Sequence, residues 1–306
     1  MKRLICGLLV CALLLSGCAG VREPERKQYN ATFLTLFDTV TTVVGLAQSQ
    51  DAHMQTAQKI HDELLVYHQL FDIYNDYEGI SNLKTVNDRA GQEPVAVDEA
   101  IIALLKDCSS YYELTGGKVN VAMGSVLRLW HNARTAGLND PANAKLPDRK
   151  ALEEAAKHTS WDTIVIDEAA STVFIQDPEQ LLDVGAVAKG WSVQRVAEAA
   201  PSGLLISVGG NVCATGPKDH NGTPWVVGIQ NPNGGDYLHT IYVSSGSIVT
   251  SGDYQRAYVV DDKVYHHIID PATGCPADSG LTSVTILCKN GMTADVLSTA
   301  LFVMGL

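Results

Sequence analysis

The chain has 306 residues and a formal net charge of −12 at pH 7. This length suits one large or two small domains, and the acidic balance argues against nucleic acid or an anionic membrane surface as a partner. No two of the seven cysteines form a C-x-x-C pair, so neither a zinc ribbon nor a thioredoxin-like site is indicated.

The first residues have the pattern of an export signal. Lys2 and Arg3 precede the apolar run LICGLLVCALLL, which is shorter than the ~20 apolar residues that a membrane-spanning helix needs. The run ends in Leu-Ser-Gly-Cys, which resembles a bacterial lipobox. We therefore predict that residues 1–17 are a lipoprotein signal peptide and that Cys18 is lipidated. An ordinary signal peptide that is cut nearby, with Cys18 incidental, is the alternative.

Cleavage after the predicted signal leaves 20 basic and 34 acidic residues, a formal charge of −14. Residues 18–32 are polar enough to be a tether. We expect the protein to be exported and anchored to a membrane by its lipid, facing the periplasm or the cell exterior. An exported chain can form disulfides, but spacing assigns none among Cys108, Cys213, Cys275 and Cys288.

The first half of the exported chain is mostly helical. Residues 37–47 alternate and are rich in β-branched side chains, which predicts a strand. Apolar side chains at helical spacing predict helices over 52–74 and 98–117. The remaining elements expected here are short helices over 124–133 and 148–158 and a hairpin over 163–175.

The second half is mostly strands. Residues 183–200 turn from a Gly-containing loop into a helix, and 204–211 form a buried strand that leads into glycines. The remaining elements expected here are strands over 225–232, 238–246, 257–269 and 283–289 and a last helix over 292–306. Helices and strands thus come in blocks, which favours an α+β fold with largely antiparallel sheets over a doubly wound sheet.

Asp295 and Thr299 are four residues apart on the last predicted helix, so their side chains lie on the same face. One carboxylate and one hydroxyl suit Mg²⁺ or Ca²⁺ better than zinc. Taken alone, the pair is explained more simply by an Asp that complements the helix dipole and a Thr that packs through its methyl group.

Two glycine-containing turns allow a ligand to approach the backbone closely. D-V-G-A-V-A-K-G at 183–190 leads into a helix whose free N–H groups can bind an anion, and Asp183 and Lys189 add one charge of each sign. Its spacing is not that of a P-loop, and no G-x-G-x-x-G follows a strand here. SVGGNVCATG at 207–216 allows the same close approach, or a bulge in a sheet. Packing alone accounts for many such turns.

The segment HHIIDPATGCP at 266–276 follows an alternating strand. His266 and His267 are expected on opposite faces of that strand, so they are poor candidates to chelate one metal together. The sequence D-P-x-T-G that begins at Asp270 is a turn in its own right. A single histidine beside a phosphate-binding site can act as general base for a hydroxyl nucleophile. No G-x-S-x-G elbow is present, so nothing supports a serine hydrolase.

Together these motifs resemble the FAD:protein FMN transferase (ApbE-like) family. The resemblance rests on D-x-G-A-x-A-K-G, S-V-G-G-N, H-H-I-I-D-P-x-T-G and A-D-x-L-S-T-A-L-F-V-M-G in this order. Upstream, the segments similar to the family are FDTV at 37–40, FDIYNDYEGISNLKTVN at 71–87 and TGGKVNVAMGSVLRLWHNAR at 115–134. The likeness covers 33–306 and implies one flavin transferase domain with the family's tandem T-fold-like sheets. Members usually continue past the last helix, and a truncated sequence is one explanation of the abrupt end at Leu306.

The family uses Mg²⁺ to cleave the diphosphate of FAD, transfers FMN to a threonine hydroxyl of an acceptor protein and releases AMP. The resemblance implies that the metal lies between the Ala186 carbonyl and the side chains of Asp295 and Thr299. It also implies that His267 is the base that takes the threonine proton. The flavin-nucleotide contacts that it implies are Phe37, Tyr74, Lys118, Val119, Asn120, Asp183, Lys189 and Ile268. Phe37 stands where many members have Met, and Asn120 where many have Asp.

The resemblance also implies the partners. Acceptors are membrane redox proteins with covalent flavin, such as subunits of sodium-pumping quinone reductases and Rnf-type complexes, which present a Ser/Thr-Gly-Ala-Thr-like motif outside the membrane. Two other functions stay open. One is an Mg²⁺-dependent FAD pyrophosphatase, in which water replaces threonine, and the other is a non-catalytic FAD-binding lipoprotein. In the family, the residue at the position of Tyr74 is associated with the balance between transfer and hydrolysis.

Overall fold

The computed structural model describes residues 26–305. The predicted signal peptide over 1–17 and the predicted lipidation site Cys18 lie outside the described residues. Within the described range, every helix is too short or too polar to cross a lipid bilayer. The four cysteines of this range are all free thiols.

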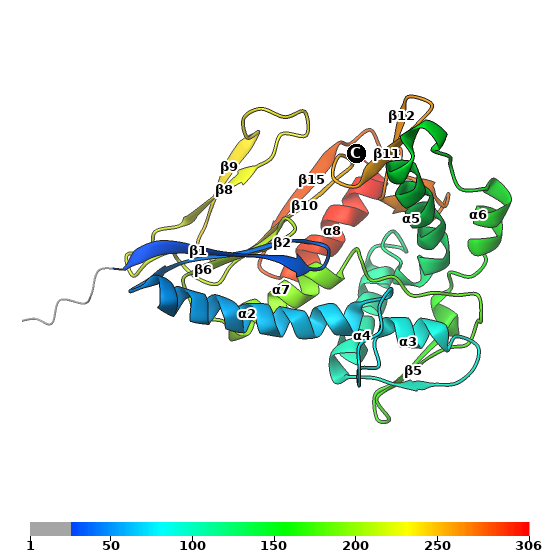
Figure 1. Cartoon of the computed structure of the whole chain (residues 1–306), viewed down its shortest axis with the longest axis horizontal. Helices are drawn as coiled ribbons and strands as arrows, with labels where there is room; N and C mark the ends of the chain where they lie inside the picture. The colour runs from blue at the N-terminus through cyan, green and yellow to red at the C-terminus, as the bar shows by residue number, and fades with distance from the viewer. Residues whose placement is uncertain (1–25, 306) are drawn as a thin grey trace, which may run out of the picture.

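A six-stranded antiparallel sheet with the order β1-β2-β6-β7-β10-β15 forms the centre of the fold (Figure 1). Its strands are β1 (Lys27–Leu36), β2 (Thr39–Ala47), β6 (Leu204–Val208), β7 (Asn211–Ala214), β10 (Gly246–Gly252) and β15 (Ser283–Cys288). The β1–β2 turn and the β6–β7 turn lie at the same end of the sheet, because Thr41 pairs with Val208 and the Gly209 amide donates to the Val40 carbonyl.

Three helices pack against one face of this sheet: α2 (Gln50–Phe71), α7 (Ala188–Ala199) and α8 (Gly291–Met304). Helix α2 begins at its N-cap Ser49, whose hydroxyl accepts a hydrogen bond from the Ala52 amide. Ile60 and Leu64 follow at helical spacing and are buried against strand residues such as Ile206. The amphipathic pattern of α2 therefore fixes which side faces the sheet.

A second layer lies beyond the C-terminal end of α2. It contains α3 (Leu83–Asp88), α4 (Glu99–Leu114) and a small sheet of β3 (Val95–Ala96), β5 (Thr172–Ile175) and β4 (Ile164–Asp167). Its core is the largest of the hydrophobic clusters and joins buried side chains of α4 and β5 to those of α7 and α8. Trp191 of α7 stands between the layers, with its ring edge-on to Phe71.

Most of the remaining elements lie near the end of the central sheet where the β1–β2 and β6–β7 turns meet. They are α5 (Gly124–Asn139), α6 (Arg149–Ala155), the hairpins β11–β12 (Ala257–Val260, Lys263–His266) and β13–β14 (Ile269–Asp270, Cys275–Pro276), and the 3-10 helices η1 (Val121–Met123), η2 (Pro141–Asn143) and η3 (Trp161–Thr163). The hairpin β8–β9 (Trp225–Ile229, His239–Val243) lies apart from them and packs against Ala214 of β7 and Ile248 of β10 (Figure 1). Helix α5 is fixed to the β13–β14 turn by a 2.8 Å hydrogen bond from Trp130 Nε1 to the Gly274 carbonyl. The inner side of α5 thus faces the sheet end (Figure 1).

The prediction of an α+β fold with largely antiparallel sheets is confirmed, since all strand pairs in the described part of the chain are antiparallel. The expected hairpin over 163–175 is β4–β5. The expected helix over 124–133 continues to Asn139, and the expected strand over 204–211 is β6 with the turn into β7.

Two predicted boundaries near the N-terminus are wrong. The tether over 18–32 was expected to end at residue 32, but residues 27–32 pair with β2 as the first part of β1. β1 is an edge strand with mostly exposed side chains, so its sequence lacks strong apolar alternation. The strand expected over 37–47 begins at Thr39, because Phe37 and Asp38 form the hairpin turn with φ of 52° each.

Candidate active site

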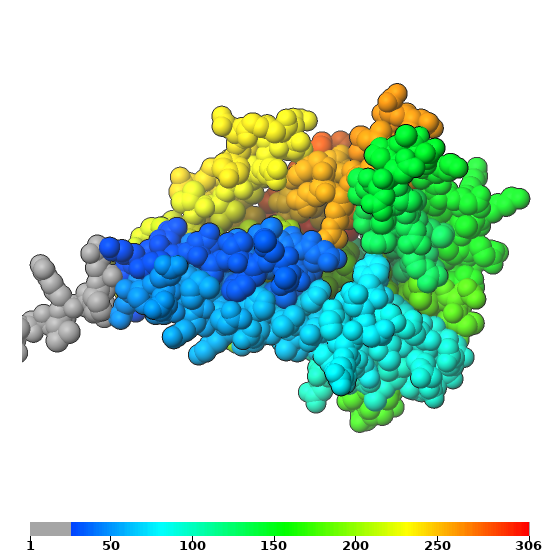
Figure 2. Space-filling model, viewed as in Figure 1, coloured from blue at the N-terminus to red at the C-terminus, as the bar shows by residue number. Residues whose placement is uncertain are grey.

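A cavity of about 500 Å³ opens at the end of the central sheet where the turns gather. Figure 2 shows the surface hollowed between the β1–β2 hairpin in blue, α5 in green and the segment around β11 in orange. All twelve site residues that the sequence predicted within the described range line this cavity: Phe37, Tyr74, Lys118, Val119, Asn120, Asp183, Ala186, Lys189, His267, Ile268, Asp295 and Thr299. The volume lies within the range of small-molecule pockets.

The carboxylate of Asp295 is held in place at the floor of the cavity. Asp295 lies in the second turn of α8, which begins at the N-cap Asn290. Only 5% of the residue is exposed, and its Oδ2 accepts hydrogen bonds from the Gly190 amide at 2.8 Å and from Asn211 Nδ2 at 3.1 Å. Burial raises the pKa of Asp295, and the Lys189 charge and the two hydrogen bonds offset part of this effect.

A glycine is required opposite Asp295. A Cβ atom at Gly190 would lie 2.5 Å from the Asp295 Cβ and 2.7 Å from the Gly291 carbonyl oxygen. Helices α7 and α8 therefore approach so closely that only hydrogen fits between them. This approach is what brings the Gly190 amide within reach of the carboxylate.

Thr299 follows Asp295 by one turn of α8 and also lines the cavity. Its hydroxyl lies 3.2 Å from Ser251 Oγ, and Ser251 Oγ lies 2.7 Å from Ser298 Oγ. Ser298 Oγ donates in turn to the Asp295 carbonyl at 2.9 Å. A chain of hydroxyl groups thus connects the end of β10 with the helix that carries the predicted metal ligands.

These residues fit a hard cation. Asp295 Oδ1 takes part in none of the hydrogen bonds recorded for residues 26–305, so one carboxylate oxygen is available at the cavity. No three His, Cys, Asp or Glu side chains gather as a metal site in the same range. A cation here would have few protein ligands, all oxygens, and this suits Mg²⁺, which retains waters and substrate phosphates as ligands.

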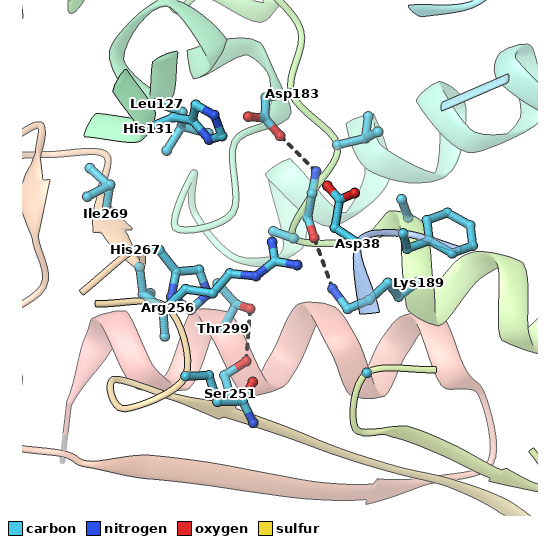
Figure 3. Close-up of a pocket in the computed structure, with 18 of the residues that line it drawn as sticks. Asp38, Leu127, His131, Asp183, Lys189, Ser251, Arg256, His267, Ile269 and Thr299 are labelled. Atoms are coloured by element: carbon cyan, nitrogen blue, oxygen red, sulfur yellow. Dashed lines mark hydrogen bonds between the residues drawn. The ribbon is translucent and has the colours of Figure 1, made fainter. Parts of the chain in front are cut away.

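The loop before α7 presents polar backbone to the cavity. Asp183 Oδ1 accepts from the Gly185 amide at 2.9 Å, and Lys189 Nζ donates to the Gly185 carbonyl at 3.3 Å (Figure 3). No side chain caps the N-terminus of α7. Burial raises the pKa of Asp183, although the Gly185 hydrogen bond and nearby positive charges oppose this shift. Of the first four amides of α7, those of Ala188, Gly190 and Trp191 already donate hydrogen bonds, and only the Lys189 amide has no acceptor within residues 26–305. The positive end of the helix dipole and the Lys189 ammonium are therefore what this end of α7 offers to an anion.

The two histidines of the HHIIDP segment serve different purposes. His266 is bound within the fold: the Ile268 amide donates to its Nδ1 at 3.2 Å, and its Nε2 lies 3.0 Å from the Ala277 carbonyl. Because Nδ1 accepts, Nε2 carries the proton and donates to Ala277. The His266 ring also packs edge-on against Phe302 of α8.

His267 points into the cavity (Figure 3) and has no comparable partner. Its Nδ1 is buried without a hydrogen bond among the described residues. Burial, followed by the positive charges of Arg256, Lys189 and Arg134, lowers the pKa of His267 to about 3. The imidazole is therefore neutral at physiological pH, which is the form that a general base requires.

Tyr74 and Phe37 form aromatic walls of the cavity. Tyr74 is half exposed, and its ring stacks on His131 of α5 with centroids 5.1 Å apart. Burial of the hydroxyl and the nearby Asp183 raise the pKa of Tyr74 to about 12, so the hydroxyl stays protonated. Phe37 is fixed by its amide, which donates to His68 Nδ1 at 3.3 Å, and by edge-on contact with the His68 ring.

The other predicted flavin contacts already make hydrogen bonds, ion pairs or packing contacts within the protein. Lys118 Nζ lies 3.4 Å from Asp270 Oδ1, which connects two of the sequence motifs. Asn120 caps η1 by accepting from the Ala122 amide and donates to the Thr159 carbonyl, so both ends of its amide are occupied. The neighbouring Val119 and Ile268 are buried in hydrophobic clusters beside the cavity.

Sequence reasoning missed several residues of the cavity. Asn211 ends the S-V-G-G-N motif but was assigned no role, yet its side chain donates a hydrogen bond to Asp295. His131 and Arg134 lie one turn apart on the inner face of α5, with Arg134 Nη2 3.2 Å from His131 Nδ1. Asp38 lies within the FDTV segment at 37–40 but was given no role, and Arg256 reaches the cavity from a turn that carries no recognisable motif. The i, i+3 spacing of His131 and Arg134 on α5 is a signal, but it is common on helix surfaces.

A model of the ApbE family matches residues 37–306 of this chain. A Treponema pallidum protein named FAD:protein FMN transferase is 31% identical over 98% of this chain and 84% of its own length. A Vibrio cholerae protein of the same name is 31% identical over 97% of this chain and 86% of its own length.

Solved structures give the same picture. The crystal structure of the ApbE protein from Thermotoga maritima is similar with a TM-score of 0.79 and 33% identity, covering 91% of this chain and 87% of that one. The flavin transferase ApbE from Vibrio cholerae is similar with a TM-score of 0.74 and 26% identity, covering 92% and 88%.

We expect the variant Gly190→Ala to be less stable than the natural chain by about 1–3 kcal/mol, because the added methyl group forces α7 away from α8. The same shift lengthens the Gly190–Asp295 hydrogen bond. Unfolding in urea measures the free-energy change. An unchanged unfolding midpoint would show that the two helices tolerate a wider separation.

Proposed function

The chain belongs to the ApbE family, and from this premise we propose that it transfers FMN from FAD to a threonine hydroxyl of an acceptor protein as a phosphoester, releasing AMP. The observation that carries the proposal is the gathering of Asp295, Thr299 and the neutral His267 in one cavity with the α7 N-terminus. A hydroxyl nucleophile, a base and a site for phosphate charge are what phosphoryl transfer requires.

The diphosphate of FAD fits the α7 side of the cavity. The positive end of the α7 dipole and the Lys189 ammonium supply positive potential there, and the absence of a side chain at Gly185 favours close approach of a ligand to the backbone. Tyr74 and Phe37 offer faces for the flat rings of the substrate. These residues orient FAD with its phosphates toward α8.

Asp295, Thr299 and the Ala186 carbonyl would hold Mg²⁺ beside these phosphates. When bound, the ion would withdraw charge from the phosphate oxygens and favour departure of AMP. Asp295 enters this role already oriented by Gly190 and Asn211, so little rearrangement is needed.

His267 would act on the acceptor. As the threonine oxygen attacks the FMN phosphorus, its proton passes to the imidazole of His267. A new phosphorus–oxygen bond forms, and the bond to AMP breaks with its electron pair on the AMP phosphate. The neutral state of His267 before the reaction follows from its burial among positive charges.

The acceptor must reach this cavity as part of another protein, and the cavity opens to the surface (Figure 2). We propose acceptors of the covalent-flavin type, with a Ser/Thr-Gly-Ala-Thr-like motif exposed outside the membrane. Lipidation at Cys18 would keep the enzyme on the same membrane face as these acceptors. Diffusion in two dimensions would then bring the two proteins together.

Incubation with FAD, Mg²⁺ and an acceptor peptide containing the threonine motif tests the function. Transfer gives flavin fluorescence on the peptide and one AMP for each labelled peptide. Free FMN and AMP with an unlabelled peptide would identify a hydrolase instead. Retention of intact FAD would identify a storage protein.

We expect His267→Ala to slow transfer to the peptide by about 10²–10⁴-fold, because the acceptor hydroxyl loses its base. FAD retention, measured by flavin fluorescence quenching, should change little. His266→Ala serves as the matched control for loss of an imidazole, since His266 is bound within the fold. If His267→Ala transferred FMN at the natural rate, His267 would not be the base.

Asp295→Asn keeps the size of the side chain but removes its charge, so we expect Mg²⁺-dependent turnover to fall by roughly a hundredfold or more. FAD retention should weaken much less, because the rings and the α7 side of the cavity are unchanged. Titration of activity with Mg²⁺ measures the effect. If the variant kept both its rate and its Mg²⁺ requirement, the metal would have to lie elsewhere.

The lowered pKa of His267 has a consequence for pH dependence. A histidine with a depressed pKa keeps its neutral form to lower pH, so protonation of His267 should not reduce kcat/KM for FAD between pH 8 and pH 5. The profile is measured at saturating Mg²⁺, because protons compete for Asp295. A loss of kcat/KM centred at about 6.5, the usual histidine value, would contradict the assignment.

A further inference from the structure

Four basic side chains line the cavity, and three of them already have partners. Lys118 lies 3.4 Å from Asp270 Oδ1, Lys189 donates to the Gly185 carbonyl at 3.3 Å, and Arg134 contacts His131 at 3.2 Å. Arg256 is the exception: no hydrogen bond or ion pair is recorded for it with any residue between 26 and 305. Its guanidinium therefore remains available for a ligand.

Arg256 reaches the cavity from the turn between β10 and β11. The base of this turn is fixed, because the Asp253 amide donates to the Thr282 carbonyl at 3.1 Å and Gly252 lies beneath the Tyr254 ring. Arg256 itself is exposed on the solvent side, and Figure 3 shows its side chain extending over the cavity beside His267 and Thr299. The side chain is thus anchored at its backbone and free at its charged end.

The charge of Arg256 acts on groups on several sides of the cavity. After burial, it is the largest influence that lowers the pKa of His267, and it also lowers the pKa of Arg134 on α5. It opposes the raised pKa of Asp183 on the α7 loop. These effects agree with a guanidinium that lies centrally, between the predicted base and the α7 N-terminus.

We propose that Arg256 is a phosphate-binding catalytic residue, which contacts the FMN phosphoryl group as it moves from AMP to the acceptor. This inference rests on the proposed function. A guanidinium can bind two phosphate oxygens at once, with a geometry that a lysine does not reproduce. Its place beside His267 assigns it to the phosphoryl group under attack, whereas Lys189 lies on the α7 side.

The role is one of charge stabilisation during transfer. When the threonine oxygen approaches phosphorus, negative charge redistributes over the phosphoryl oxygens and the departing AMP. Arg256 meets this charge without reorganising the floor of the site, since it stems from a turn outside α7 and α8. It should therefore contribute more to the rate at saturating FAD than to FAD affinity.

Arg256→Gln tests the inference. We expect kcat for transfer to fall by about 10²–10³-fold, and the dissociation constant for FAD to rise by less than about tenfold. Arg128→Gln is the matched control, because Arg128 is an exposed arginine on α5 that does not line the cavity. Thermal unfolding of both variants establishes that each remains folded.

A second variant separates a chemical role from a structural one. In Arg256→Ala, added methylguanidinium should restore part of the transfer rate, whereas it should leave the natural chain and Arg128→Gln unchanged. Arg256→Lys should recover only part of the rate, since it keeps the charge but not the fork geometry.

The outcomes distinguish the two proposals. If the natural chain transfers FMN and Arg256→Gln does so at the same kcat, the role of Arg256 is wrong while the proposed function stands. If only FAD affinity falls, Arg256 binds the substrate without assisting transfer, and the inference is again overturned. If the natural chain does not transfer FMN to the peptide, the proposed function fails and this role with it.

Discussion

The hydrogen bond from the Gly190 amide to the Asp295 carboxylate is the contact on which the site depends. It exists because a glycine lets two helices meet almost backbone to backbone. A carboxylate buried to this extent is costly unless polar groups or a cation compensate it. Two N–H donors supply part of that compensation, and the raised pKa of Asp295 shows that it is incomplete. The carboxylate is oriented but not neutralised, which is the condition for binding a cation.

The location of the cavity follows from the antiparallel sheet. The turns of the β1–β2 and β6–β7 hairpins and the end of β10 all fall at one end of the sheet, and α7 begins there. Turns and helix starts are where a chain exposes unpaired backbone N–H groups. The second core beneath α7 and the clusters around α5 then fix the walls. The antiparallel pairing that orders the strands thus also brings polar groups together at the end of the sheet where the cavity opens.

Much of this site could be predicted from the sequence. Asp295 and Thr299 were found because helical spacing places them on one face, and the resemblance to the family assigned them a chemistry. Strand alternation placed His266 and His267 on opposite faces, and the resemblance to the family assigned the base role to His267. These are local rules, in which a few neighbouring residues determine the geometry.

What the sequence did not reveal depends on contacts between distant segments. Asn211 donates a hydrogen bond to the carboxylate of Asp295, which is 84 residues away in the sequence. Nothing in the motif SVGGN indicates that this side chain contacts the last helix. Arg256 lies in an ordinary turn between β10 and β11. It reaches the cavity only because folding brings this turn close to α8. The strand β1 was missed for a related reason, because an edge strand buries few side chains and so leaves a weak apolar pattern.

The hydroxyl groups beside Thr299 determine which oxygen donates in each hydrogen bond among them. Ser298 gives its only hydrogen to the Asp295 carbonyl, so the short contact with Ser251 must be donated by Ser251. Ser251 then has no hydrogen left for Thr299, and Thr299 must donate to Ser251. The lone pairs of the Thr299 oxygen are consequently turned toward the open space. Through Ser298 and Ser251, the Asp295 carbonyl of α8 thereby polarises the hydroxyl of Thr299, whose oxygen faces the cavity.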